Sequence, residues 1–146
     1  MDAAEILKRK GKSVFTVAPE VKVREAMRLM LKYNVGSLVV QDKSDRVVGI
    51  VTERDIFKLT YEHEGKIMDV QVAAVMTDEL LVAFPEDPVP YLKGLITENR
   101  IRHLPVMVEG KLVGIISIGD IIKEEISEVA VGNRNLKNYI ATSYSA

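Results

Sequence analysis

Hydrophobic positions in the first half of the chain alternate between the spacing of strands and that of helices. Residues 13–17 form a short strand pattern, and residues 38–40 and 47–51 predict two further strands. The last of these is apolar at successive positions, which favours a central strand covered on both faces. Between the first strand pattern and residues 38–40 lies a stripe with helical spacing, made of Val23, Ala26, Met27, Met30 and Leu31. A second helix is predicted through Ile56, Phe57 and Leu59.

The second half repeats this order. Residues 80–83 predict a strand, a helix buries Val89, Leu92, Leu95 and Ile96, residues 106–108 and 111–116 predict a strand pair, and a last helix carries Ile121, Ile122 and Ile126. Pro19 corresponds to Pro85 and Ser37 to His103 at a spacing of 66 (85 − 19, 103 − 37), and Gly49 corresponds to Gly114 at 65 (114 − 49). A tighter turn between the last two strands of the second copy accounts for the difference. The duplication predicts one pseudo-symmetric module whose two copies pack together.

Five segments follow from this pattern. Residues 1–12 are a helical lead-in that ends in a basic run and stops at Gly11, residues 13–59 and 72–128 are the two repeats, residues 60–71 are a polar linker, and residues 129–146 are a tail with a short helix. The basic run has two interpretations, a solvated helix end or a lip that attracts phosphate. His63, in the linker, is interpreted as a surface histidine.

Composition narrows the class of protein. The chain has 146 residues, and 47% of them are hydrophobic, which is enough for a shared core. The 20 basic and 21 acidic residues leave a net charge of −1, so no global field favours nucleic acid or an anionic membrane. There is no cysteine, and the sequence starts without the pattern of a signal peptide. We therefore expect a soluble cytoplasmic protein.

The candidate chemistry lies where a strand gives way to a helix. Thr52 and Asp55 are three residues apart at one such junction, and Ser117 and Asp120 are at the equivalent place in the other repeat. This spacing is that of a helix capping box with aspartate in place of glutamate. Its duplication after an apolar strand, with cationic residues close by, also suits a ligand. A carboxylate can accept hydrogen bonds from both hydroxyls of a ribose, and a hydroxyl, an arginine and free backbone amides suit a phosphate.

Other kinds of site find little support. Gly11-Lys12-Ser13 resembles the end of a P-loop, but the first glycine of that motif would fall on Ile6. The chain has two histidines and neither G-x-G-x-x-G nor H-E-x-x-H, and neither aspartate has an evident nucleophile or metal ligand beside it. We expect no catalytic residues, no metal site and no enzyme.

Four segments together resemble the tandem cystathionine-β-synthase-type (CBS) domain pair, or Bateman module: residues 47–56, 75–77, 101–106 and 112–120. The resemblance covers residues 12–126. It implies an α/β (α+β) fold of two β-α-β-β-α units related by a pseudo-twofold and packed sheet against sheet. Two ligand clefts would lie between the units.

The resemblance also implies which residues line the clefts. The first cleft would be lined by Ile50, Thr52, Arg54, Asp55, Met76, Thr77, Ile101, Arg102 and His103. The second would be lined by Lys12, Ser13, Val35, Gly36, Ser37, Ile115, Ser117, Gly119 and Asp120. Aspartate would hold the ribose, hydroxyl and basic residues the phosphate, and apolar residues the adenine. We expect the first cleft to prefer the more phosphorylated ligand, and Val39, where the other repeat has Pro105, to weaken the loop of the second.

The implied function is a regulatory sensor of an adenosine-containing ligand: AMP, ADP, ATP, NAD(H) or S-adenosylmethionine. It would signal through its conformation or through a homodimer of CBS pairs, to a partner that the sequence does not identify. The alternatives are a structural adaptor with empty clefts and a nucleotide-processing enzyme.

Overall fold

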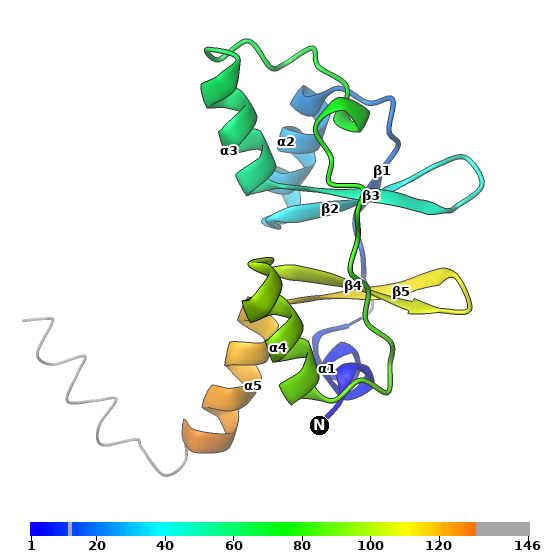
Figure 1. The fold of residues 1–146 in the computed structure, drawn as a ribbon, viewed down its shortest axis with the longest axis vertical. Coiled ribbons are helices and arrows are strands. Elements are labelled where there is room, and N and C mark those ends of the chain that lie inside the picture. Colours follow the sequence, from blue (N-terminus) through cyan, green and yellow to red (C-terminus); the bar gives the residue numbers. More distant parts are fainter. Residues whose placement is uncertain (12, 131–146) are drawn as a thin grey trace, which may run out of the picture.

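A computed structural model describes residues 1–11 and 13–130, with side chains to residue 126. The chain forms two halves, stacked one above the other in Figure 1 with their sheets in the middle and helices toward the two ends. The first half comprises β1 (Thr16–Val17), α2 (Val23–Tyr33), β2 (Ser37–Gln41), β3 (Val47–Thr52) and α3 (Glu53–Glu62). The second comprises α4 (Val89–Asn99), β4 (His103–Val108), β5 (Lys111–Ser117) and α5 (Ile118–Ala130), and the remaining elements are α1 (Ala3–Lys10) and the 3-10 turn η1 (Val72–Ala74). The α/β class is confirmed, and so is the predicted order of elements except for one strand of the second half.

The two halves differ in their first strand. β1 runs parallel to β2, with Val17 opposite Val40, whereas the second half keeps only an isolated bridge between Ala83 and Val106. The prediction of a strand over residues 80–83 is therefore wrong. The amide of Val39 donates to the carbonyl of Phe15 at 3.2 Å, but its counterpart Pro105 has no N–H. The pairing that would extend the strand is lost.

β3 lies at the edge of its sheet, since the strand order is β1-β2-β3. The prediction of a central strand is wrong, although β3 is covered on both faces because Gly49, Ile50 and Val51 are all buried. Gly49 is covered by Met76 and Thr77, from the segment that follows the 3-10 turn. Part of the free edge is also paired, since Ile50 and Thr77 exchange backbone hydrogen bonds of 3.0 and 2.9 Å.

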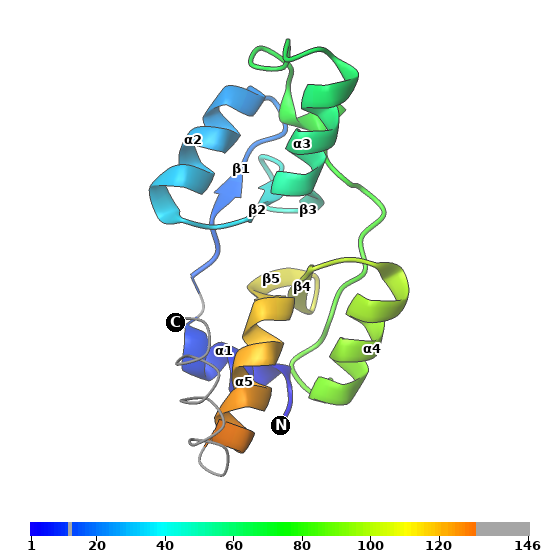
Figure 2. The same cartoon turned by 90° about the vertical axis from the view of Figure 1, so that its left-hand side faces the viewer.

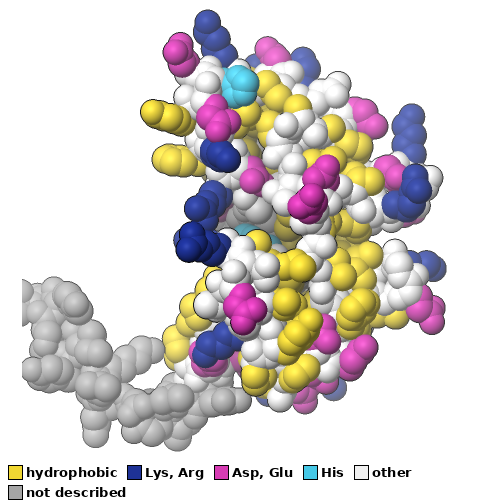
Figure 3. Space-filling model, viewed as in Figure 1, with side chains coloured by type: hydrophobic (Ala, Val, Ile, Leu, Met, Phe, Trp, Pro, Cys, Tyr) yellow, Lys and Arg dark blue, Asp and Glu magenta, His cyan; other side chains and the backbone are white. Residues whose placement is uncertain are grey.

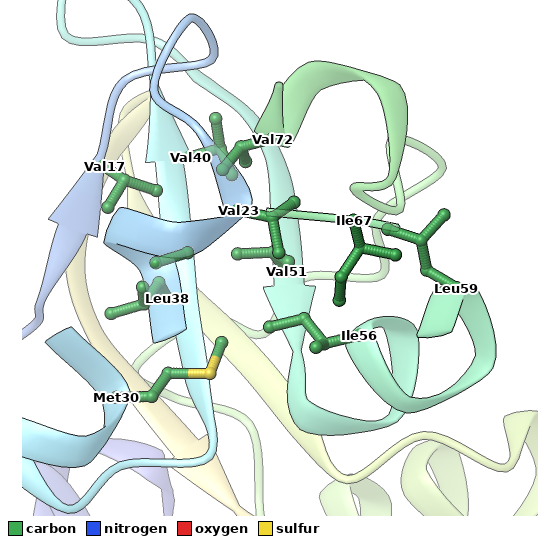
Figure 4. Packing of buried hydrophobic residues seen from close by; sticks show 11 residues of the cluster. Val17, Val23, Met30, Leu38, Val40, Val51, Ile56, Leu59, Ile67 and Val72 are labelled. Atoms are coloured by element: carbon green, nitrogen blue, oxygen red, sulfur yellow. The ribbon is translucent and has the colours of Figure 1, made fainter. Parts of the chain in front are cut away.

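The core of the first half lies between its sheet and the helices α2 and α3. Figure 4 shows Val23 and Met30 of α2, Leu38 of β2, Val51 of β3 and Ile56 of α3 pointing toward one another. Ile67 and Val72 join this core from the predicted linker and the turn after it. The predicted linker, residues 60–71, overlaps the end of α3, because this helix runs to Glu62.

α1 completes the core of the second half, although it precedes the first half in sequence. Its buried residues Ala3, Ile6 and Leu7 pack with the cluster that includes Leu104 and Ile116. α1 ends at Gly11, as predicted, where φ is 92°. The chain then crosses to the other half, and the segment before α4 crosses back, so two connections join the halves (Figures 1 and 2).

Two further points concern the predicted tail helix and helices that could cross a membrane. The predicted tail helix, with Leu136, Tyr139 and Ile140, lies outside the described residues. Among the residues that are described, none of the helices has the length and apolar character needed to cross a membrane.

Candidate functional site

Both strand-to-helix junctions form the capping box that their spacing allows. In the first junction, β3 to α3, Thr52 N–H donates to Asp55 Oδ2 at 2.9 Å and Asp55 N–H donates to Thr52 Oγ1 at 3.2 Å. In the second, β5 to α5, Ser117 N–H donates to Asp120 Oδ2 at 2.8 Å and Asp120 N–H donates to Ser117 Oγ at 3.1 Å. Each box uses one carboxylate oxygen. The other, Oδ1, takes no hydrogen bond from the described part of the chain and can still accept one from a ligand.

A cavity of about 920 Å³ lies between the two halves, beside these junctions. Its lining includes eight of the nine residues predicted for the first cleft: Ile50, Thr52, Arg54, Asp55, Thr77, Ile101, Arg102 and His103. Gly36, Ser117 and Gly119, predicted for the second cleft, line the same cavity. In Figure 3 the surface is hollowed at the waist, with histidine atoms inside and Lys and Arg side chains at the rim. The structure thus joins residues of both predicted clefts in one space.

Several predicted site residues lie elsewhere. Met76, Ser13, Val35, Ser37, Ile115 and Asp120 are not in the lining of this cavity, and Lys12 lies outside the described residues. Ser37 is 9% exposed and pairs with Thr52 in the sheet, and Val35 packs against the first core. The Sδ of Met76 would be 2.6 Å from a Cβ at Gly49, so this side chain covers β3 instead of facing the cavity.

Other lining residues were not predicted from the sequence, most importantly Arg100 and Glu53. Arg100 ends α4 with φ of 53°, a left-handed conformation that a non-glycine residue adopts at a cost. At a spacing of 66 it corresponds to Asn34, which ends α2 with φ of 52°, so the repeat could have revealed its position. Glu53 lies over Gly36, where a Cβ would be 2.7 Å from the carboxylate Oε1.

Charge is distributed unevenly around the cavity. Arg54, Arg100 and Arg102 are exposed and line it near the first junction, whereas Gly36 and Gly119 take the corresponding places near the second. His103 is half-buried between them. Burial is the main cause that lowers the pKa of His103 below the ordinary 6.5, and Lys10 adds to the effect, while the carboxylates of Asp120 and Glu53 oppose it. The imidazole is therefore neutral at pH 7 and able to take up a proton when an anion arrives.

Asp120 differs from Asp55 in having a cationic partner. Lys10 Nζ, at the end of α1, lies 2.6 Å from Asp120 Oδ2 and donates to the carbonyl oxygen of Ile115 at 2.8 Å. The Lys10 and Asp120 side chains are 29% and 20% exposed. The sequence predicts for the basic run that contains Lys10 only a solvated helix end or a lip that attracts phosphate. Nothing in the sequence pattern brings the first helix to the second repeat.

His63 and the other acidic residues add little to the site. His63 is exposed at the C-terminal end of α3, as predicted, and borders a smaller hollow of about 350 Å³ that also reaches Asp55 and Glu62. Within residues 1–11 and 13–130, no group of three or more His, Asp or Glu side chains is arranged to hold a metal ion.

Comparison with known proteins identifies relatives over most of the chain. The family model of the CBS domain matches twice, at residues 3–62 and 72–127. The chain is 32% identical over 149 residues to the CBS domain-containing protein CBSX3, mitochondrial, of Arabidopsis thaliana. This match covers 97% of this chain and 72% of that protein.

Two solved structures bear on the fold and the site. The CBS-domain containing protein ATU1752 from Agrobacterium tumefaciens is 35% identical with a TM-score of 0.84, over 86% of this chain and 100% of that one. The CBS domain pair of protein MJ0100, in complex with 5′-methylthioadenosine and S-adenosyl-L-methionine, is 25% identical with a TM-score of 0.76, over 88% and 98% of the two chains.

Proposed function

Since the chain belongs to the CBS domain family, as a tandem pair of these domains, we propose that it is a regulatory module that binds an adenosine-containing ligand in the cavity between its halves. The observation that carries the proposal is the convergence of Asp55 and Thr52, from the first half, on Arg102 and His103, from the second. A ligand that contacts both halves can change their relative position when it binds. The module would report the ligand through its conformation and would catalyse no reaction.

The lining supplies the chemistry that each part of such a ligand needs. Asp55 has a free carboxylate oxygen for the two ribose hydroxyls, because its capping box uses only Oδ2. Thr52 Oγ1 and the arginines suit a phosphate, and Ile50 and Ile101 offer apolar contact for adenine. A volume of about 920 Å³ lies within the usual range of small-molecule sites.

The arginines indicate which ligands are preferred. Arg54, Arg100 and Arg102 together favour a ligand with several negative charges, so we propose that AMP, ADP, ATP or NAD(H) binds at the first junction in preference to S-adenosylmethionine. The MJ0100 structure shows that a related CBS pair accepts adenosine compounds without phosphate. The phosphate preference is thus proposed as a property of this chain's own residues.

Exposed apolar side chains suggest how the module assembles. Phe57 and Tyr61 of α3 are 79% and 85% exposed, and Ile118, Ile122 and Ile126 form an exposed stripe along α5. We propose that these helix faces pair with a second copy of the chain in a homodimer. An unidentified regulated protein would then recognise the state of this dimer.

The test is calorimetric titration with AMP, ADP, ATP, NAD(H), S-adenosylmethionine and adenosine, comparing the natural chain with Asp55→Asn. Asparagine retains an oxygen for the Thr52 amide but loses the charge, so the helix stays capped. We expect affinity for every bound ligand to fall about tenfold or more, since hydrogen bonds to a charged group contribute about 1.5–3 kcal/mol. The control is Asp87→Asn, because Asp87 Oδ2 likewise accepts from an amide three residues earlier, that of Phe84 at 2.8 Å, and does not line the cavity.

Binding of no ligand by the natural chain would reject the sensor and favour a structural adaptor. Binding that Asp55→Asn leaves unchanged would remove the assigned role of Asp55. Turnover of ATP or NADH, followed by product analysis on the same samples, would instead support the enzyme.

A further inference from the structure

The arginines that line the cavity differ from the other described arginines in having no carboxylate partner. Away from the cavity, every described arginine forms an ion pair with a carboxylate: Arg9, Arg24, Arg28 and Arg46. The side chains of the three cavity arginines, Arg54, Arg100 and Arg102, form neither an ion pair nor a hydrogen bond within the described residues. Carboxylates are close by, since Glu53 and Glu79 line the same cavity. The guanidinium groups are therefore available to a ligand.

Arg100 is also held in a backbone conformation that does not suit its side chain. It follows the last turn of α4 with φ of 53°, in the left-handed region where a Cβ comes too close to the backbone. Glycine is the usual residue at such a helix end. The backbone alone forms the turn, because the N–H groups of Arg100 and Ile101 both donate to the carbonyl oxygen of Ile96. The turn therefore does not require an arginine.

The other repeat has the same turn without the charge. Asn34 ends α2 with φ of 52°, and the N–H groups of Asn34 and Val35 both donate to the carbonyl oxygen of Met30. Asparagine tolerates the left-handed conformation better than arginine does. Asn34 does not line the cavity, whereas Arg100 does. The residue that the backbone tolerates less well is thus the one that faces the ligand space.

We propose that Arg100 is a specificity-determining residue, which makes the affinity of the cavity rise with the number of phosphates on the ligand and lowers the stability of the unliganded fold. The inference rests on the proposed function, because it concerns the same ligand class. Each phosphate brings negative charge to an unpaired guanidinium group, whereas adenosine brings none. Arg100 therefore contributes most to the binding of ATP, less to that of AMP and nothing to that of adenosine.

The first test is calorimetric titration of the natural chain, Arg100→Ala and Arg100→Gly with adenosine, AMP and ATP, without magnesium. Both substitutions remove the guanidinium group. We expect the affinity for ATP to fall at least about threefold, which is within the range for an exposed ion pair. The affinity for AMP should fall less, and that for adenosine should stay the same. Arg100→Lys should retain part of the preference for ATP, because it keeps the charge.

The second test is thermal denaturation of the same variants without ligand. Arg100→Gly should raise the midpoint by about 2–4 °C, because glycine has no Cβ to oppose the left-handed conformation. Arg100→Ala keeps a Cβ and should show no such gain. An equal loss of ATP affinity in two variants of different stability would assign the loss to the missing charge and not to the turn.

Two controls match the charge and the turn separately. Arg46→Ala removes the same charge from an arginine that pairs with Asp42 at 3.1 Å and does not line the cavity. Asn34→Gly changes the equivalent turn of the other repeat, which is also outside the lining. Both variants should bind all three ligands like the natural chain.

The outcomes distinguish this inference from the proposed function. If the natural chain binds none of the three ligands, the proposed function fails and the role of Arg100 fails with it. If Arg100→Ala weakens adenosine as much as ATP, or leaves all three affinities unchanged, the role of Arg100 is rejected while the proposed function stands. An unchanged midpoint in Arg100→Gly would show that the arginine has no cost, and the link between stability and specificity would be overturned.

Discussion

His103 shows how one side chain can make ligand binding depend on pH. Burial and the nearby Lys10 lower the pKa of His103 below 6.5, so the side chain is neutral at pH 7 before a ligand arrives. A phosphate in the cavity adds negative charge, which favours the imidazolium form and raises this pKa. Binding of a phosphorylated ligand should therefore take up a proton, and its affinity should gain as the pH falls toward the unliganded pKa.

The prediction is that AMP binding to the natural chain takes up a proton at about pH 6.5. The measurement is calorimetry of AMP binding in two buffers with different heats of ionisation, repeated with His103→Gln, which should abolish the additional uptake. His63→Gln is the matched control, since His63 is exposed on α3. The titration of the phosphate itself is common to all variants and cancels in the comparison. Equal proton uptake by the natural chain and His103→Gln would contradict the prediction.

The same pKa shift has a consequence for the stability of the unliganded protein. The unfolded chain binds a proton on this histidine below its ordinary pKa of 6.5, while the folded chain resists protonation. The contribution of His103 to stability is thus present above pH 6.5 and is lost as the pH falls through the lower pKa of the folded state. A bound phosphate reverses this tendency, which makes His103 a point where ligand and pH act together.

At the scale of single elements, the docking of α1 decides whether the second half has a complete core. Gly114 of β5 lies under Leu7, and a Cβ at this position would be 2.5 Å from the Leu7 Cδ2 atom. We predict that Gly114→Ala destabilises the protein by about 1–3 kcal/mol, because the buried Leu7 side chain must move to make room for the methyl group. Gly94→Ala is the matched control, since nothing lies within 4 Å of a Cβ there and alanine favours the helix α4 by about 0.5–1 kcal/mol.

Chemical denaturation of the two variants should therefore show shifts of opposite sign. An unchanged stability of Gly114→Ala would mean that α1 adjusts without cost. In that case α1 would be only loosely held, and the core of the second half would not depend on it.

The elements also show where the sequence was sufficient and where it was not. The runs of β2 and β3 and most of the stripe of α2 were predicted because local periodicity reflects burial. Leu31 was wrongly included in that stripe, since its side chain is 83% exposed. The shortened first strand of the second half needed a pairing argument, namely that Pro105 cannot donate the hydrogen bond that Val39 donates. The edge position of β3 was missed because part of its cover comes from Met76 and Thr77, far along the chain, which periodicity within one strand cannot reveal.

That four candidate residues would come together was predictable from the sequence, because the duplication places equivalent residues at equivalent junctions. Asp55, Thr52, Arg102 and His103 were named from the repeat and the family resemblance, and all four line one cavity. Lys10 lay beyond that reasoning. It reaches Asp120 across 110 positions of the sequence, and a contact of that range depends on the docking of α1.

At the scale of the whole molecule, two helices expose apolar side chains to solvent. α3 and α5 lie on the side that faces the viewer in Figure 2, and each carries an exposed apolar stripe, with Phe57 and Tyr61 on one and Ile122 and Ile126 on the other. These side chains are spaced by four residues, so each pair lies on one helix face. Two such stripes on one side of a small protein are typical of an interface.

We therefore predict that the natural chain sediments as a dimer at micromolar concentration and that Phe57→Glu/Ile122→Glu sediments as a monomer. A glutamate buried at a dimer interface would lose its water without gaining a partner, so two of them should weaken the dimer by several kcal/mol. Val108→Glu is the control, because Val108 is 39% exposed at the end of β4, in a hairpin whose turn points away from α3 and α5 in Figure 1. Dimers that survive in the double variant but are lost in Val108→Glu would place the interface on the hairpins, and ligand signals would then have to reach the partner through the sheets.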